Sequence, residues 1–255
     1  MRIALITGAS SGLGRAFAER LDRYGDVEEL WLVARRRDRL EELAARLNKP
    51  ARILEYDLAR EESIQALKEL LEAEQPVVGY LVNSAGFGKF GTYADLTLQE
   101  TNNMIRVNCQ AAVDLTVISI PFMTQGSRIL EIVSSSSFQP LPGLNVYAAT
   151  KAFMLHYARA LRWELAGRGI VVTAVCPIWI KTEFIQVAKD TKNGSTVRFF
   201  PFASRPGPIA SRALLASKLR LGVATCSIPA LIQRVAAKFI PHCLIMGVWT
   251  LTKKI

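Results

Sequence analysis

The feature that most constrains the fold is a regular alternation of apolar runs and helical segments over the first 176 residues. The apolar runs have strand length and are rich in branched side chains, as in strands buried on both faces of a sheet. They occupy residues 2–7, 29–34, 52–56, 77–82, 128–133 and 170–176. Stretches of helical periodicity separate them at 13–24, 37–48, 60–74, 97–120 and 146–167. Such alternation forms βαβ units. The sequence therefore predicts an α/β fold, a doubly wound Rossmann-type domain with a mostly parallel sheet and helices on both faces.

The alternation stops after Cys176. Pro and Gly are frequent between residues 177 and 210, which favours a loop or short helices over another βα unit. Further on, we expect a helix at 209–219, a short strand at 222–228 and apolar helices after Pro229 and Pro241.

We find no internal repeat and no low-complexity linker, so one domain over residues 1–255 is the economical interpretation. Its expected parts are a cofactor-binding and catalytic core (1–182), a substrate lid (183–222) and an apolar, basic C-terminal extension (223–255).

The charge is distributed unevenly along the chain. The net charge is +10, from 32 Lys and Arg against 22 Asp and Glu. Residues 1–150 hold 16 basic and 19 acidic side chains, a net −3, whereas residues 151–255 hold 16 and 3, a net +13. The second part has either an anionic partner or a solvated basic surface. No nucleic-acid-binding motif accompanies the charge, so we expect no nucleic-acid partner, and peripheral membrane contact through the C-terminal tail is the more plausible use.

Cysteine and histidine usage predicts no metal site and a reducing compartment, the cytoplasm. The four cysteines are widely spaced, none lies in C-x-x-C, and two histidines are too few for an ordinary zinc site. Residues 2–7 form a short β-type run rather than the apolar core of a signal peptide. The longest charge-free apolar stretch, residues 239–252, is 14 residues long and too short to span a bilayer unaided.

A glycine-rich turn follows the first apolar run and reads T-G-A-S-S-G-L-G over residues 7–14. Glycines at a strand-to-helix turn let the backbone approach a pyrophosphate, which binds at the N-terminus of the next helix. The spacing is G-x-x-x-G-x-G and differs from the G-x-G-x-x-G fingerprint. Even so, its place between a first strand and an amphipathic helix indicates a dinucleotide site.

The same turn also satisfies G-x-S-x-G, the nucleophile elbow of hydrolases, with Ser10 at its centre. An elbow serine needs an oxyanion donor from an earlier strand-to-helix loop, and only seven residues precede Gly8. Neither His156 nor His242 has a supporting motif for the catalytic base. We therefore favour the dinucleotide site.

The second apolar run ends in A-R-R-R at residues 34–37. An acidic residue here would bind a ribose 2′-hydroxyl, whereas arginine accommodates a 2′-phosphate. Arg35 therefore favours NADP(H) over NAD(H). For Arg37 we prefer the simpler interpretation, a solvent-exposed residue that opens a helix.

Tyr147 and Lys151 stand four residues apart on an expected helix, so they share one face. An ammonium near a phenol lowers the phenol pKa from about 10, which makes Tyr147 a general acid/base for a carbonyl or an alcohol. The fifth apolar run ends in four serines, Ser134 to Ser137, at the edge where open α/β sheets bind ligands. A hydroxyl there could hydrogen-bond the substrate oxygen.

Two further motifs carry amide side chains. The fourth apolar run ends in N-S-A-G at residues 83–86, and Asn108 lies in the middle of a long expected helix. A buried asparagine in mid-helix makes a structural hydrogen bond or helps to place a water.

Together these residues resemble the short-chain dehydrogenase/reductase family over residues 1 to about 182. The resemblance implies that Tyr147 is the catalytic acid/base and that Lys151 lowers its pKa and binds the nicotinamide ribose. It also implies that Asn108 fixes a water in a proton relay from Lys151 and that a serine holds the substrate oxygen. The usual interval to the tyrosine selects Ser134, but alignment of the serines selects Ser135, which we predict as catalytic.

The resemblance also implies the residues that bind the cofactor. Asp57 and Leu58 would line the adenine pocket, and Arg35 matches the basic position of NADP-preferring members. The full set is Gly8, Ser10, Ser11, Gly12, Leu13, Gly14, Arg35, Asp57, Leu58, Asn83, Ala85, Gly86, Tyr147, Lys151, Pro177, Ile180 and Thr182.

Three departures from the family pattern stand out. Ser84 replaces the second asparagine of the common N-N-A-G, and Ile178 replaces the glycine that usually follows Pro177. The C-terminal strand and Gly-Gly that many tetrameric members use are absent, so we expect a dimer rather than the usual tetramer.

We therefore predict an NADP(H)-dependent oxidoreductase that interconverts a ketone or aldehyde and an alcohol. The expected lid combines apolar side chains with basic ones, which suggests a lipid-like substrate with an anionic end, such as a steroid, a bile acid or a fatty acyl derivative. The apolar residues are Phe184, Ile185, Phe199, Phe200 and Phe202, and the basic ones are Lys189, Lys192, Arg198 and Arg205. The alternative is a non-catalytic dinucleotide-binding sensor or interaction protein, which the intact set of catalytic residues disfavours.

Overall fold

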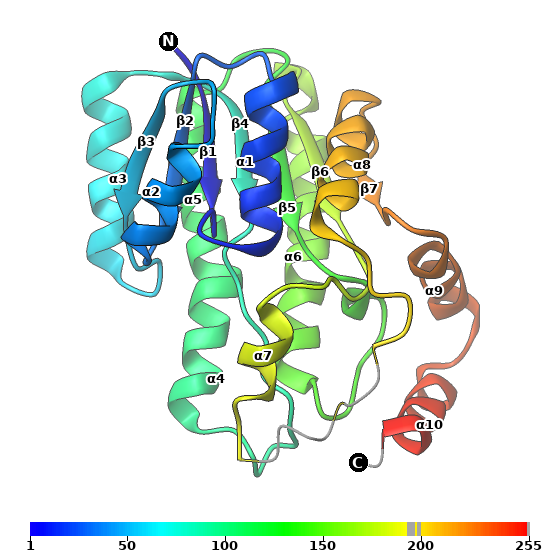
Figure 1. Cartoon of the computed structure of the whole chain (residues 1–255). Coiled ribbons are helices and arrows are strands. Elements are labelled where there is room, and N and C mark those ends of the chain that lie inside the picture. The colour runs from blue at the N-terminus through cyan, green and yellow to red at the C-terminus, as the bar shows by residue number, and fades with distance from the viewer. Residues whose placement is uncertain (193–196, 198–199, 254–255) are drawn as a thin grey trace.

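The computed structural model describes residues 1–192, 197 and 200–253. Its strands form one parallel sheet in the order β3-β2-β1-β4-β5-β6-β7 (Figure 1). They are β1 (Arg2–Thr7), β2 (Glu29–Ala34), β3 (Ala51–Glu55), β4 (Val77–Asn83), β5 (Arg128–Ile132), β6 (Val171–Val175) and β7 (Val223–Ala224). The six apolar runs expected as strands all form strands, and the strand expected at 222–228 shrinks to two residues.

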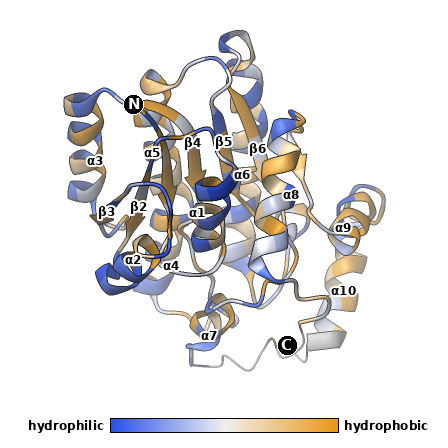
Figure 2. Ribbon diagram, turned by 45° about the horizontal axis from the view of Figure 1, so that its top comes forward, coloured by the Kyte–Doolittle hydropathy of each residue, from blue (hydrophilic) through white to orange (hydrophobic). Residues whose placement is uncertain are grey.

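Helices cover both faces of the sheet, and the strands are hydrophobic along their length (Figure 2). One face packs against α1 (Gly12–Tyr24), α2 (Arg37–Ala44) and α8 (Pro206–Lys218). The other packs against α3 (Glu61–Glu74), α5 (Ala111–Ser119) and α6 (Asn145–Glu164). The predicted doubly wound α/β fold is confirmed.

The helix expected at 97–120 is divided into parts. It begins as α4 (Leu98–Ile105) at a capping box formed by Thr97 and Glu100, and it continues through a π-helical turn, Arg106–Gln110, into α5. Such a wide turn shifts the side chains that follow it relative to a regular helix, and π turns are frequent at functional sites. This turn contains Asn108.

The segment after β6 contains short helices, as expected. α7 (Phe184–Lys189) lies below the carboxyl edge of the sheet in Figure 1, and α8 covers the sheet beside α1. Because α8 belongs to the layer on the sheet, the part of the expected lid that lies near the cleft ends before Pro206. The chain continues into α9 (Ile228–Phe239) and α10 (His242–Lys253), at the right of Figure 1. Among the described residues, no helix has both the length and the apolar character needed to cross a bilayer.

The chain order reverses between β1 and β4. From β1 the chain builds the sheet outwards through β2 and β3, and it then returns to place β4 on the other side of β1. The loops after β1 and β4 therefore diverge, and a crevice opens at the carboxyl edge between them.

Candidate active site

A cleft of about 680 Å³ lies at this carboxyl edge and is lined by the loops that follow β1 to β6. Most of the predicted cofactor residues line it, which brings together positions that are far apart in sequence. They are Gly8, Ser10, Ser11, Gly12, Leu13, Arg35, Asp57, Leu58, Ala85, Gly86, Tyr147, Lys151, Pro177, Ile180 and Thr182.

Two predicted cofactor residues lie outside the lining and support it from behind. A Cβ on Gly14 would lie 2.4 Å from the carbonyl oxygen of Gly8, so glycine lets α1 pack closely on the turn. The amide of Asn83 points into the core and donates to Ala112 O, Thr116 Oγ1 and Glu131 Oε1 at 2.9–3.1 Å. Both residues thus shape the walls of the site, and their contact with the cofactor stays a prediction.

The glycine-rich turn fits an anionic group. Gly8 has a φ of +66°, and a Cβ there would lie 2.9 Å from the backbone of Ala85, so only glycine allows β1 to turn this close to the loop after β4. Ser11 is the N-cap of α1, but its side chain accepts no hydrogen bond from the first turn. Those backbone N–H groups, with the helix dipole, remain available for a pyrophosphate.

Tyr147 and Lys151 lie on the buried face of α6, beside the cleft. The Lys151 ammonium donates to Ile132 O at 2.7 Å and lies 5.8 Å from the centroid of the Tyr147 ring. In the loop after β4, a Cβ on Gly88 would lie 2.9 Å from Tyr147 Cδ2. This loop therefore packs closely against the phenol ring that α6 carries.

Burial controls the protonation of this pair. It raises the pKa of Tyr147 to about 12 and lowers the pKa of Lys151 to about 8. Loss of hydration thus acts against the lowering of the tyrosine pKa by Lys151, which stays a prediction. At neutral pH the phenol is protonated, which is the form required of a proton donor to a carbonyl oxygen.

Ser134 is the serine in contact with Tyr147. A hydrogen bond between the two side chains partly offsets the rise in the Tyr147 pKa, and Ser134 Oγ also accepts from Ser136 N at 3.1 Å. Ser134 is extended and prolongs β5, whereas Ser135 begins a 3-10 turn and donates its N–H to Pro177 O at 2.8 Å. Both serines line the cleft, but this contact favours Ser134, contrary to our prediction of Ser135.

Asn108 ties the loop after β4 to α6. Its Oδ1 accepts from Phe87 N at 3.0 Å, and its Nδ2 donates to Phe87 O at 2.9 Å and to Thr150 Oγ1 at 3.1 Å. It is buried behind Gly86, where a Cβ would lie 2.9 Å from Asn108 Oδ1 and 3.5 Å from Lys151 Nζ. Asn108 thus holds the backbone beside Lys151, and its role in placing a water stays a prediction.

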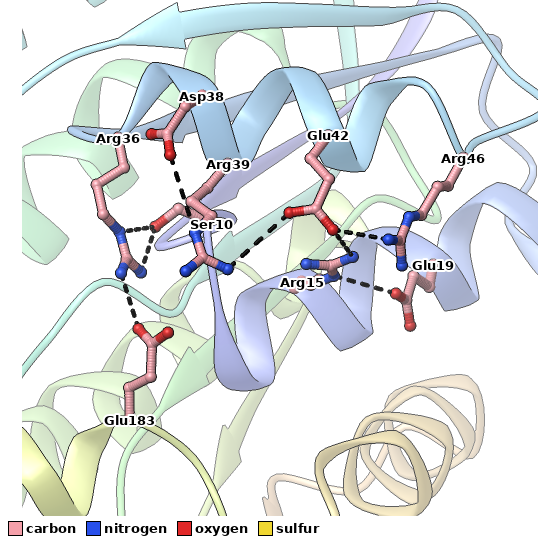
Figure 3. A network of polar contacts seen from close by, with 9 residues as sticks. All are labelled: Ser10, Arg15, Glu19, Arg36, Asp38, Arg39, Glu42, Arg46 and Glu183. Atoms are coloured by element: carbon pink, nitrogen blue, oxygen red, sulfur yellow. Dashed lines mark hydrogen bonds and ion pairs between the residues drawn. The ribbon is translucent and has the colours of Figure 1, made fainter.

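The arginines after β2 flank the cleft at the side of the glycine-rich turn. Arg35 and Arg36 both line it. Arg36 donates to Ser10 Oγ at 3.1 Å and pairs with Glu183 at 2.8 Å, which links the turn to the segment after β6 (Figure 3). We had not singled out Arg36, although the three consecutive arginines were its signal. Arg37 pairs with Glu41 on the surface, in keeping with our interpretation of it.

The far side of the cleft is apolar and aromatic. The ring of Phe184 packs 5.3 Å from that of Tyr147, and Trp179 packs 5.0 Å from Phe200. Of the other apolar lid residues that we predict, Ile185 and Phe200 lie outside the lining, Phe202 is exposed, and Phe199 lies outside the described residues. The wall residues that we did not predict are Leu141, Leu144, Trp179, Val187 and Trp249.

The basic side chains of the expected lid do not line the cleft. Lys189, Lys192 and Arg205 are exposed outside it, and Arg198 lies outside the described residues. The substrate side of the cleft is instead lined by Lys89, which is nearly buried and lies 3.3 Å from Glu100 and 3.6 Å from Asp190. Lys189 lies over the ring of Phe200, with its ammonium 5.2 Å from the ring centroid, on the outer side of the lid.

Residues 2–193 match the family model of the short chain dehydrogenases. The chain belongs to the short-chain dehydrogenase/reductase family. Sulfoacetaldehyde reductase 2 from Chromohalobacter salexigens is 36% identical over 191 residues, which are 72% of this chain and 75% of that protein. Members of the short-chain dehydrogenase/reductase family are oxidoreductases that interconvert carbonyl and alcohol groups with a nicotinamide dinucleotide.

Two solved structures of the family resemble this chain along its whole length. A short-chain dehydrogenase from Sphingobium yanoikuyae in complex with NADPH is 31% identical with a TM-score of 0.80, and the match covers 100% of this chain and 96% of that one. A bulky-bulky ketone specific alcohol dehydrogenase from Comamonas testosteroni is 27% identical with a TM-score of 0.76, covering 100% and 95%.

Proposed function

We propose that this member of the family is an NADP(H)-dependent oxidoreductase that reduces a bulky apolar ketone or aldehyde, or oxidises the matching alcohol. The observation that carries the proposal is the contact of Ser134 with Tyr147 beside Lys151, at the junction of the glycine-rich turn and the apolar wall. A bound nicotinamide supplies or accepts the hydride.

Three side chains bind the carbonyl oxygen and transfer the proton. Ser134 donates a hydrogen bond to the carbonyl oxygen, Tyr147 delivers the proton to that oxygen, and the Lys151 ammonium stabilises the resulting phenolate. Ile132 O holds Lys151 in place through its 2.7 Å hydrogen bond. In the oxidation direction the same groups work in reverse.

The preference for NADP(H) over NAD(H) rests on the arginines after β2. Arg35 and Arg36 line the cleft where β2 ends, and the preceding residue is Ala34 rather than an acid. A guanidinium can bind a 2′-phosphate with two hydrogen bonds. The NADPH complex of the Sphingobium yanoikuyae enzyme supports the same preference.

The aromatic wall supports an apolar, lipid-like substrate such as a steroid, a bile acid or a fatty acyl derivative. The likeness to the bulky-bulky ketone specific enzyme supports a ketone with two large substituents. An anionic end of the substrate would have to meet Lys89, because Lys189, Lys192 and Arg205 lie outside the cleft.

We also propose that the protein works in the reducing cytoplasm, in keeping with its four free cysteines, and that it forms a dimer. Light scattering coupled to size-exclusion chromatography measures the molar mass of the assembly, and the mass of a tetramer would contradict the proposed dimer.

Tyr147→Phe tests catalysis. We expect it to abolish NADPH oxidation with a panel of ketones, because the ring remains but the transferable proton is lost, while NADPH binding by calorimetry stays unchanged. Tyr157→Phe on the same helix, outside the cleft lining, is the matched control and should retain activity. A wild type that binds NADPH but turns over no carbonyl, or full activity in Tyr147→Phe, would favour the non-catalytic sensor.

A further inference from the structure

The two C-terminal helices present apolar side chains to solvent. On α9 the exposed residues are Ile228, Leu231, Ile232, Val235 and Phe239, and on α10 they are Leu244, Val248 and Leu251. Their spacing of three or four residues places each set on one helix face. Phe239 is 80% exposed and Leu251 is 85% exposed, so this apolar face, which we call the C-terminal face, is uncovered in the monomer.

The amphipathic direction of α9 is the reverse of that in an ordinary surface helix. Gln233 and Arg234 are partly buried on the protein side, and Gln233 lines the active-site cleft. Arg234 lies near enough to buried Cys176 to lower the pKa of that thiol against the effect of burial. A helix that turns polar groups inward and Ile and Phe outward is built to meet an apolar environment on its outer side.

The helices that carry the C-terminal face hold no acidic residue. Their basic residues are Arg234, Lys238 and Lys253. Lys238 is exposed and lies between Val235 and Phe239 in sequence. Its ammonium can reach water or a lipid headgroup when those two apolar side chains enter a membrane. Orange and pale segments make up much of α9 and α10 in Figure 2, whereas α2 is largely blue.

We propose that α9 and α10 bind the surface of an anionic lipid membrane. An apolar stripe with basic and no acidic residues is the pattern of an interfacial helix. A second copy of this chain fits less well, because α9 and α10 hold no acidic residue that could pair with Lys238 across a twofold interface.

Membrane binding would place the mouth of the cleft at the lipid surface. Gln233 of α9 and Trp249 of α10 line the cleft, and Trp249 Nε1 donates to Pro142 O at 2.8 Å, between the serine turn and α6. The same two helices thus face the lipid and border the substrate cavity. This part of the inference rests on the proposed function, since it gives an apolar substrate a route from the bilayer.

Co-sedimentation with vesicles tests the proposal without turnover or cofactor. The full chain is mixed with vesicles of phosphatidylglycerol and phosphatidylcholine, or of phosphatidylcholine alone. We expect sedimentation with the anionic vesicles only, weakened by salt. Ile232→Ser combined with Phe239→Ser should reduce the binding more than tenfold, and Lys238→Gln should reduce it about fivefold.

The matched control is Trp163→Ser at the end of α6, where the indole is 83% exposed. It should leave vesicle binding unchanged. The Ile232 and Phe239 double variant should keep its circular dichroism and its turnover of a water-soluble ketone, because neither residue lines the cleft. A wild type that stays in the supernatant with both vesicle types overturns the proposal. If the wild type binds no vesicles and is a dimer, and if the double variant is a monomer, the C-terminal face is instead the interface with a second copy.

Discussion

Tyr147 and Lys151 are one helical turn apart, and burial moves both toward their neutral forms. With a tyrosine pKa of about 12 and a lysine pKa of about 8, the phenol keeps its proton at neutral pH and the ammonium is nearer to losing its own. The Ser134 hydroxyl acts against this shift of the phenol, since its hydrogen bond lowers the tyrosine pKa. The chemistry of the site thus depends on a few polar contacts inside an apolar cavity.

Ser134→Ala should reduce kcat for ketone reduction by roughly 10²-fold, because it removes the hydrogen-bond donor to the substrate oxygen and the contact with Tyr147. Ser135→Ala is the matched control one residue away and should have a much smaller effect. Steady-state kinetics with NADPH and a bulky ketone separates the two. If Ser135→Ala is the more damaging variant, the assignment from the Tyr147 contact is wrong.

Arg35→Ala should reduce kcat/KM for NADPH by roughly 10- to 100-fold and leave that for NADH nearly unchanged, since it removes charge-assisted hydrogen bonds to the 2′-phosphate. Arg39→Ala in α2, the helix that follows Arg35, is the control, because Arg39 pairs with Glu42 and lies outside the cleft lining. An equal fall in kcat/KM for NADPH and for NADH would show that Arg35 does not bind the 2′-phosphate.

At the scale of elements, β5 brings a carboxyl group into the interior of the sheet. Glu131 is buried, and burial raises its pKa to about 7 although Asn83 and Thr116 hydrogen-bond its Oε1 and Lys151 is nearby. Tyr157 also faces this group, and the Glu131 charge raises the pKa of that phenol. The polar cluster joins β4, β5, α5 and α6 beneath the active site.

The raised pKa predicts that stability falls as pH rises. Between pH 4.5 and about 7 the folded state keeps the Glu131 proton and the unfolded state releases it, so the folded state loses this advantage across that window. Glu131→Gln should remove about 2 kcal/mol of the difference in unfolding free energy between pH 5 and pH 8. Urea unfolding at the two pH values measures it, with exposed Glu28→Gln as the control. An unchanged pH dependence in Glu131→Gln would show that another group is responsible.

The strands were predicted well because their signal is local. A strand buried on both faces is apolar where it is buried, and residues 3–6 and 30–34 show this directly. The helix expected at 97–120 was predicted in extent but not in its π turn, since periodicity averaged over many residues does not reveal one extra residue in a turn.

At the scale of the whole molecule, the cofactor site spans both halves of the sheet, so binding should stabilise the fold as a unit. NADPH at 100 times its Kd would add about 2.7 kcal/mol to the unfolding free energy. For a chain of this size we expect a rise in Tm of roughly 5–10 °C. Differential scanning fluorimetry should show a larger shift with NADPH than with NADH at equal concentration, and Arg35→Ala should remove the difference. A larger shift with NADH would contradict the proposed preference.

The sequence by itself determined the fold class and the strand order along the chain, because hydrophobic periodicity is a local property. Its combined family motifs also selected Tyr147 and Lys151 as the expected catalytic pair. It also located the excess charge in the last part of the chain. Only the tertiary structure distinguished Ser134 from Ser135, moved Asn83 and Gly14 out of the cleft, added Arg36 and Lys89 to its lining, and turned the apolar side of α9 toward solvent. Each of these depends on the direction in which a side chain points, and that direction is set by packing between elements that are distant in sequence.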